Sequence, residues 1–413
     1  MFVKIIKFKI TFFLTNNQRK LKIYKKLNKN LEINNNPQKF LVIRISSLGD
    51  VLLTSALIRN IKKTFPDAII DFVVDRQFEE IVKHNPHINN VIIYDKKLTV
   101  KENNRIKKNL PNDYKIIDLQ NNFRSFFFRK GLGKEVAVFK KSRIKKLLLV
   151  WLKINLFGKN DLPIPEKYIT VANKFGIKNS TVATNNAGLE IWLPEEKELD
   201  YYPPTIKKAN FFSDKKKYFF AIAPGAKHKT KQWLPEYFAE LILLLSKKYD
   251  AKFYLLGGKD DKKNCDLIIE KIYSKITNNN PTDIFNSEIK VINNKIVSIK
   301  HPIEIINNSG KTSIIETTRL IDKYDLLITN DTGIMHIGAA RKLPIVAIFG
   351  STVSSFGFAP FGTKYKICEV DLKCRPCTHI GQKECPKKHF NCMKLLKPEM
   401  VLEAVIRCLL TNK

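Results

Sequence analysis

Asp331, Thr332 and Gly333 form a short polar turn between two apolar runs, and His336 follows closely. The runs within 325–350 are typical of buried strands, and the small residues after the turn predict a helix that starts there. A helix start presents unpaired backbone N–H groups and the positive end of the helix dipole, which suit a phosphate. Asp331 is expected to cap this helix, with His336 about one turn further along. A phosphorylated ligand, such as a nucleotide, and an ordinary capped strand–helix–strand unit fit the segment equally well.

A second polar turn, Ser46-Ser-Leu-Gly-Asp50, follows the apolar run 39–45. Gly49 allows a ligand to approach the backbone closely, and Asp50 lies where a helix dipole would hold its carboxylate. Asp50 is therefore either a helix cap or a base that takes the proton of an attacking hydroxyl. The turn lacks the glycine patterns of dinucleotide enzymes and of phosphate-loop NTPases.

A basic turn at 224–233 follows another apolar run. Gly225 permits an unusual backbone turn, and Lys227, Lys229 and Lys231 surround it. Backbone amides and lysines suit a diphosphate, whereas the alternative is a solvated basic loop.

An acidic turn at 255–261 contains Gly257, Gly258, Asp260 and Asp261. Asp260 or Asp261 is placed to accept hydrogen bonds from ribose hydroxyls. A simple turn explains the same residues equally well.

Alternating strands and helices position these turns. In the first half, the predicted strands are 39–45, 68–74, 91–94 and 115–119, and the clearest helices are 51–65 and 78–83. A second set begins with a strand at 218–223 and continues with a helix at 233–249 and a strand at 252–256. This alternation is typical of α/β proteins with mostly parallel sheets, where ligands bind beyond the carboxyl ends of the strands. We therefore expect the polar turns to meet in one cleft between two sheets.

A chain of 413 residues is long enough for two domains. We predict a basic and apolar extension with its linker at 1–37, a first domain at 38–199, an interdomain linker at 200–217 and a second domain at 218–413. The polar stretch 275–314 has no clear pattern.

The net charge of +34 favours an anionic partner, which is nucleic acid, an anionic membrane face or a phosphorylated substrate. The chain is rich in both Lys and Asn, so a biased genome is the alternative explanation. The apolar start at 1–14 is interrupted by lysines and is followed by a basic run at 19–26, so it fits neither a secretion signal nor a membrane span. An interfacial segment and a frayed extension both fit it. We expect a cytoplasmic protein. If the start of the chain is an interfacial segment, the protein is peripheral to the inner membrane surface.

Five cysteines lie within a Cys-rich segment at 368–392, near the end of the chain. The spacing of Cys374, Cys377, Cys385 and Cys392 is compatible with a structural zinc ion. Disulfides are disfavoured in a reducing cytosol, and free cysteines that pack a loop are the alternative.

Two stretches, 123–130 and 139–152, are both basic and apolar. They are either core helices of unusual charge or a surface that suits a phosphorylated lipid head group. If the substrate is a glycolipid, the second interpretation, a surface for a lipid head group, is favoured.

The polar turns together resemble the ADP-heptose:lipopolysaccharide heptosyltransferases, glycosyltransferase family 9, over roughly Phe40 to Ile406. The matching motifs are Ser46-Ser-Leu-Gly-Asp50, Asp118-Leu-Gln-Asn-Asn-Phe-Arg-Ser125, Ala223-Pro-Gly-Ala with Thr230-Lys-Gln-Trp233, and Asn330-Asp-Thr-Gly with Met335-His336. The resemblance implies an α/β fold of the GT-B type, with two Rossmann-like domains facing across a cleft. It also implies an inverting heptose transfer from ADP-heptose to the inner core of lipopolysaccharide, with no metal or other cofactor required.

The resemblance also implies roles for individual residues. Asp50 matches the general base, and Lys231 matches a lysine that contacts the donor phosphates. The remaining donor-binding residues would be Gly225, Ala226, Lys227, Thr230, Asp260, Asp331, Thr332, Gly333 and His336. The acceptor-binding residues would be Ser47, Gly49, Gln120 and Arg124, and the acceptor would be a phosphorylated or acidic glycolipid. Hydrogen-bond donors and positive charges that face the leaving diphosphate would stabilise its developing negative charge.

Four other functions remain in competition. One is a non-catalytic relative that binds a sugar nucleotide, which activity assays would separate. A transferase that uses a different nucleotide sugar would keep the same motifs. A nucleic-acid-binding protein would explain the charge, although the basic residues form no single stripe, no binding module is apparent and nucleic acid is not the expected partner. An oxidoreductase is disfavoured by the missing glycine pattern.

Overall fold

The computed structural model of the chain describes residues 37–158, 161–178, 188–196, 217–278, 290–292, 295–297 and 303–410. The predicted extension at 1–37 and linker at 200–217 lie outside the described residues, apart from Pro37 and Lys217. The domain boundaries drawn from the sequence therefore stay predictions.

The first half of the described chain forms a five-stranded parallel sheet in the order β3-β2-β1-β4-β5. Its strands are β1 (Lys39–Ile43), β2 (Ile69–Val74), β3 (Asn90–Ile93), β4 (Lys115–Asp118) and β5 (Glu135–Val138). The connecting helices are α3 (Leu48–Leu52), α4 (Ser55–Thr64), α5 (Glu79–Val82), α6 (Val100–Arg105), α7 (Phe123–Arg129), α8 (Arg143–Leu147) and α9 (Ile164–Val171). Alternate residues of β1 enter opposite core clusters, as expected for a sheet covered on both faces.

The second half forms a six-stranded parallel sheet in the order β10-β7-β6-β11-β12-β13. Its strands are β6 (Tyr218–Ala223), β7 (Ala251–Leu255), β10 (Glu304–Asn307), β11 (Leu326–Asn330), β12 (Ile345–Ile348) and β13 (Tyr365–Cys368). The helices are α10 (Pro235–Lys248), α11 (Lys262–Asn278), α12 (Ile314–Ile321), α13 (Gly333–Ala340), α14 (Asn391–Lys394) and α15 (Pro398–Leu410), and a small hairpin pairs β8 (Lys290–Ile292) with β9 (Lys295–Val297). The predicted parallel α/β alternation is confirmed in both halves.

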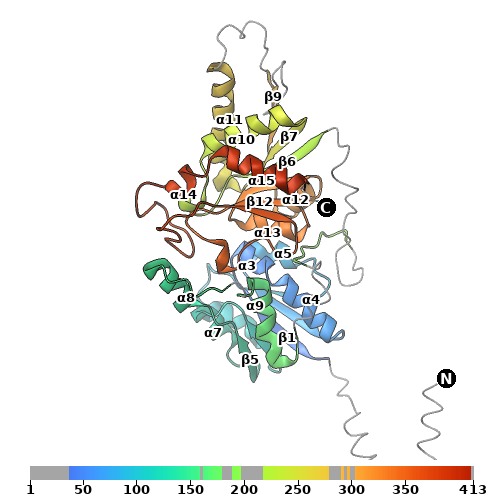
Figure 1. Cartoon of the computed structure of the whole chain (residues 1–413). Helices are drawn as coiled ribbons and strands as arrows, with labels where there is room; N and C mark the ends of the chain where they lie inside the picture. Colours follow the sequence, from blue (N-terminus) through green and yellow to red (C-terminus); the bar gives the residue numbers. More distant parts are fainter. Residues whose placement is uncertain are drawn as a thin grey trace, which may run out of the picture. The chain divides into compact units, whose positions relative to one another are not determined.

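Helices cover both faces of the second sheet. Side chains of α10, α11 and α15 share one core cluster with the sheet, whereas α12 and α13 lie on the opposite face. The cluster that contains α13 also includes residues of β1, α3 and α4, so one apolar core continues from the first sheet to the second. Figure 1 shows α3 and α13 beside each other.

The prediction of a single helix at 51–65 is wrong. The chain turns at Leu53 and Thr54 and forms α3 and α4 instead. The Thr54 hydroxyl donates to the Val51 carbonyl at 2.6 Å, which satisfies a backbone group exposed by the break. Strand β10 lies inside the polar stretch 275–314, where the residue pattern predicts no element.

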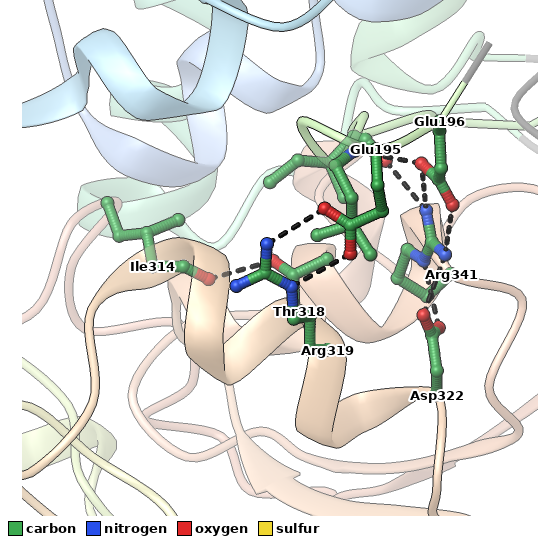
Figure 2. A network of polar contacts seen from close by, with 9 residues as sticks. Glu195, Glu196, Ile314, Thr318, Arg319, Asp322 and Arg341 are labelled. Atoms are coloured by element: carbon green, nitrogen blue, oxygen red, sulfur yellow. Dashed lines mark hydrogen bonds and ion pairs between the residues drawn. The ribbon is translucent and has the colours of Figure 1, made fainter.

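Segment 188–196 follows the first sheet and is fixed by arginines on both sides. Arg59 of α4 forms a buried ion pair with Glu190 at 2.7 Å. On the other side, Arg341 reaches Glu196 and Asp322, each at 2.7 Å, and Arg319 of α12 binds Glu195 at 2.8 Å (Figure 2). The segment therefore connects α4 of the first sheet to helices of the second through charged contacts.

Candidate functional site

Asp50 lies in the first turn of α3, directly after the loop that leaves β1. Ser47 donates to its Oδ2 atom through the backbone N–H at 3.4 Å and through the hydroxyl at 2.9 Å. The Arg44 guanidinium lies 2.7 Å from its Oδ1 atom. Asp50 therefore does cap the helix, but a carboxylate has about four lone-pair positions and can still accept a proton.

The surroundings of Asp50 set its charge. Burial raises the pKa of the carboxyl, but the charge of Arg44 and hydrogen bonds from Arg44 and Ser47 outweigh burial and hold the pKa below its ordinary value. Tyr168 of α9 completes the cluster, with its hydroxyl 3.5 Å from Asp50 Oδ1 and its ring 5.7 Å from the Arg44 guanidinium. The Asp50 side chain is 20% exposed, so an ionised and accessible carboxylate is available near neutral pH.

Helices α3 and α13 meet through their first turns (Figure 1). A Cβ atom on Gly49 would lie 2.6 Å from Cδ2 of His336, and one on Gly333 would lie 2.6 Å from Cδ2 of Leu48. Neither position has room for a side chain without movement of the neighbour. This packing places the turn that carries Asp50 against the turn at the start of α13, as the cleft hypothesis requires.

His336 is buried at this junction. Burial lowers the pKa of its imidazole to about 4, although Asp331 and Asp50 favour the charged form. Its Nδ1 atom has no hydrogen-bond partner among the described residues. The side chain is therefore a neutral imidazole between the two turns at physiological pH.

Asp331 does not cap α13, so that prediction is wrong. Its Oδ2 atom lies 2.6 Å from the Lys231 ammonium and accepts a hydrogen bond from the Thr352 hydroxyl at 2.8 Å. Thr332 is the N-cap residue, and its side chain forms no capping hydrogen bond. The first N–H groups of α13 are thus left without a side-chain cap, which is the arrangement that suits a phosphate oxygen.

The glycine turn after β6 packs against an aspartate from the turn after β7. A Cβ atom on Gly225 would lie 2.0 Å from Oδ1 of Asp261, and one on Gly257 would lie 2.6 Å from its Cβ. Asp261 accepts a hydrogen bond from the Gly258 N–H at 2.9 Å, and burial raises its pKa. Asp260, the predicted ribose ligand, is exposed. Of the two acidic residues left open by the sequence, Asp261 is the one that lies against the basic turn.

Internal hydrogen bonds shape the basic turn itself. The Asn330 side chain donates to the Pro224 carbonyl at 2.7 Å and accepts from the Trp233 N–H at 3.1 Å. The Thr230 hydroxyl accepts from the Gln382 N–H at 2.8 Å and from the Ser351 hydroxyl at 3.0 Å. The Ala226 carbonyl accepts from Gln232 at 2.6 Å, and Lys227 is exposed.

The predicted acceptor residues differ in accessibility. Gln120 is buried, and its side-chain oxygen accepts from the backbone N–H groups of Ile45 and Ser46 at 3.0 and 3.2 Å, so it holds the loop before α3. Arg124, at the start of α7, is exposed, as is Ser47. Arg124 is thus the predicted acceptor residue with a positive charge open to solvent.

All seven cysteines are free in the structure. Burial raises the pKa of Cys392 to about 11 and also raises that of Cys377, and neighbouring thiols of the cluster act in the same direction. Within the described ranges, no three Cys, His, Asp or Glu side chains are grouped closely enough to hold a metal ion. The four predicted zinc ligands are therefore near one another but not arranged as a metal site.

Two residues of the site were not singled out from the sequence. Arg44 interrupts an otherwise apolar strand end, and that position is the signal that would have identified it. Tyr168 gave no signal, because it stands among apolar residues of an ordinary helix.

The arrangement as a whole joins an ionised carboxylate to a helix start without a side-chain cap and to a lysine. No helix in the described part of the chain is long and apolar enough to cross a membrane.

Comparison with known proteins gives consistent matches. The model of glycosyltransferase family 9, the heptosyltransferases, matches residues 104–388. Lipooligosaccharide heptosyltransferase 2 of Campylobacter jejuni is 29% identical over 363 residues, which cover 86% of this chain and 93% of the relative.

Solved structures show the same fold. A family 9 glycosyltransferase from Veillonella parvula matches with a TM-score of 0.63 and 18% identity, over 91% of this chain and 98% of that one. The ADP-heptose lipopolysaccharide heptosyltransferase II of E. coli matches with a TM-score of 0.57 and 20% identity, over 91% and 99% of the two chains. The GT-B fold predicted from the sequence is thereby confirmed.

Proposed function

The chain belongs to glycosyltransferase family 9, the heptosyltransferases, and we propose that it transfers a heptose from ADP-heptose to the inner core of lipopolysaccharide. The names of its C. jejuni relative and of the similar E. coli enzyme support this donor and acceptor. The observation that carries the assignment of the site is the packing of Gly49 on His336, which brings Asp50 to the turn of Asp331, Thr332 and Gly333.

The donor diphosphate binds to the second half of the chain. Backbone N–H groups at the start of α13 and at Gly225-Ala226 bind its oxygens, and the Lys231 ammonium leaves Asp331 to neutralise the departing ADP. Asp261 or Asp260 accepts hydrogen bonds from the ribose. The backbone N–H groups and the Lys231 ammonium interact more strongly as negative charge develops on the leaving group, so they favour the transition state over the bound donor.

Asp50 is the general base on the acceptor side. Its ionised carboxylate removes the proton from the attacking hydroxyl, which then displaces ADP from the opposite face of the sugar and inverts the anomeric configuration. Arg124 and Ser47 bind the anionic acceptor, while Gln120 fixes the loop. No metal takes part in this reaction scheme.

The setting of the reaction is also proposed. The enzyme works in the cytoplasm at the inner membrane, where its glycolipid acceptor resides. A structural zinc ion on Cys374, Cys377, Cys385 and Cys392 stays a prediction that would require the four thiols to move together.

An ADP-release assay on the purified full chain tests the function. ADP should appear only when ADP-heptose and a lipopolysaccharide core acceptor are both present, with acceptors that carry no heptose or one heptose compared, and NMR of the product should show an inverted anomeric centre. Turnover with a UDP- or ADP-linked hexose instead would assign a different nucleotide sugar. No ADP release with any heptose donor would contradict the proposal.

Asp50→Asn tests the base. Because the amide keeps the volume but cannot take the proton, kcat should fall by about 10²–10⁴-fold, with the Kd for ADP nearly unchanged in calorimetry. Asp67→Asn, on an exposed turn after α4, is the matched control and should leave kcat unchanged. A fully active Asp50→Asn enzyme would remove Asp50 from the mechanism.

A further inference from the structure

An apolar face on the first half of the chain is open to solvent. Helix α8 continues into a π-helical turn at Leu148–Leu152, and the apolar side chains of this helix and of the segment after it are exposed. These side chains, named here the α8 face, are Ile144, Leu147, Trp151, Leu152, Ile154 and Leu156. Ile144 and Trp151 are 73% and 78% exposed, which is unusual for side chains of their size.

The helix that carries the α8 face is anchored to the rest of the protein on its opposite side. Leu149 points inward and packs with Phe157 and Phe356 in a small core cluster. The Lys153 ammonium donates to the carbonyls of Cys374 and Pro376 at 3.1 and 2.7 Å. The helix therefore keeps its apolar residues exposed although it has a buried anchor of its own.

The charge around the α8 face is mainly positive, with Asp161 in an ion pair with Lys145 at 3.4 Å. Residues 136–158 contain six lysines and arginines and no Asp or Glu. A second copy of the chain would bring two such surfaces together, which is unfavourable. Nucleic acid would satisfy the charge but offers no apolar layer for Trp151 and its neighbours. A bilayer with anionic lipids satisfies both, since lysines and arginines near its surface are attracted and Trp and Leu enter the head-group boundary.

The same helix also reaches the proposed active site. Lys146, on its inner side, lies within electrostatic range of Asp50. Its ammonium lies 5.6 and 5.3 Å from the ring centres of Phe356 and Phe358. Exposed apolar residues and a residue near the candidate base thus belong to one short, anchored element.

We propose that the α8 face docks on an anionic phospholipid bilayer and thereby presents a lipid-borne acceptor to Asp50. The docking surface is independent of the reaction, and only the presentation of the acceptor rests on the proposed function. The chain just before α8 contacts the chain just before α7, since the Lys141 ammonium donates to the Asn121 carbonyl at 3.4 Å, and α7 carries two further exposed aromatic side chains, Phe123 and Phe126.

Trp151 is a built-in reporter of docking. The chain has three tryptophans, and the other two, Trp192 and Trp233, are each 1% exposed. The full-length chain is mixed with vesicles of phosphatidylcholine alone, or of equal parts phosphatidylcholine and phosphatidylglycerol. With the anionic vesicles only, tryptophan emission should shift to shorter wavelength and brominated lipids should quench it, and raised salt should reverse the binding.

Leu147→Ser with Trp151→Ser tests the face by co-sedimentation. Partition onto the anionic vesicles should fall by at least about tenfold, because the variant loses two of the inserted side chains. Met400→Ser with Leu410→Ser, two exposed apolar residues of α15, is the matched control and should bind like the unmodified chain. Equal binding by the α8-face variant would overturn the proposal.

Turnover provides the second readout. The α8-face variant should keep its rate on a delipidated soluble acceptor and lose rate on the same acceptor embedded in anionic vesicles. Loss of self-association or of RNA binding in this variant, with unchanged vesicle binding, would assign the face to another partner and contradict the proposal. The vesicle measurements need no turnover, so they decide the docking proposal even if the chain released no ADP.

Discussion

Arg44 controls how the Asp50 carboxylate titrates. The guanidinium is buried and bonded to the Leu119 carbonyl at 2.6 Å, so it cannot swing away when Asp50 changes charge. Burial alone would raise the pKa of the Asp50 carboxyl, and the charge and hydrogen bond of Arg44 outweigh this effect. Arg44 thus keeps Asp50 ionised at the cost of some basicity, which is a compromise for a general base.

Replacement of Arg44 should shift the pH dependence of catalysis. Arg44→Met removes the charge that lowers the Asp50 pKa, so the pKa rises and the acidic limb of the kcat/KM profile should move to higher pH. Arg44→Lys keeps a positive charge and should move the limb less. The measurement is the ADP-release rate against pH for the three enzymes. An unmoved limb in Arg44→Met would mean that Asp50 is not the group that titrates.

Individual residues were predictable from the sequence where a neighbouring residue of the same loop fixes their position. Asp50 at a helix start is an example, because Ser47 and the helix lie beside it in the chain. Asp331 was misread as a cap because its actual partner, Lys231, lies 100 positions earlier and on another turn. Such long-range pairs carry no local signal.

The contact between α3 and α13 is the element-scale feature on which the site depends. Each helix supplies a glycine to the other's bulky side chain, with Gly49 under His336 and Gly333 under Leu48. Close approach of the two first turns is therefore built into the sequence of both motifs.

Gly49→Ala should disrupt this contact. The added methyl group would lie 2.6 Å from the His336 ring, which is buried and cannot move freely, so overpacking should cost about 1–3 kcal/mol of stability and also lower kcat. Gly258→Ala is the matched control, since its backbone φ of −75° suits alanine and its nearest neighbour would be 3.8 Å away. Urea denaturation and ADP release measure both effects. A Gly49→Ala enzyme as stable and active as the control would show that the two helices can separate freely.

Secondary structure was predictable where hydrophobic periodicity is strong, as in β1, β6 and α10. The break between α3 and α4 was not, because apolar residues continue through Leu53 and the turn depends on a Thr54 hydroxyl bond. Strand β5 was also missed, since it has only four residues, Glu135–Val138, and lies at a sheet edge between basic segments.

At the scale of the whole molecule, segment 188–196 connects the two sheets through arginines. Arg341 is 4% exposed and donates to both Glu196 and Asp322 and to the Ile191 carbonyl, and these bonds raise its pKa although burial lowers it (Figure 2). Arg319 forms a similar pair with Glu195, but in solvent. The sequence predicted two domains but not this connection, because its partners are separated by up to 145 positions.

Arg341→Met should destabilise the protein strongly. It leaves Glu196 and Asp322 buried without their cation, which costs roughly 3–5 kcal/mol, because buried carboxylates without a partner are far from water. Arg319→Met is the matched control, and it should have little effect because solvent already screens its pair with Glu195. Urea denaturation followed by tryptophan fluorescence compares the two, since Trp192 lies buried within the segment. If both variants unfolded at the same urea concentration as the unmodified chain, the two sheets would have to be held together by the continuous apolar core alone, and segment 188–196 would be a passive connection.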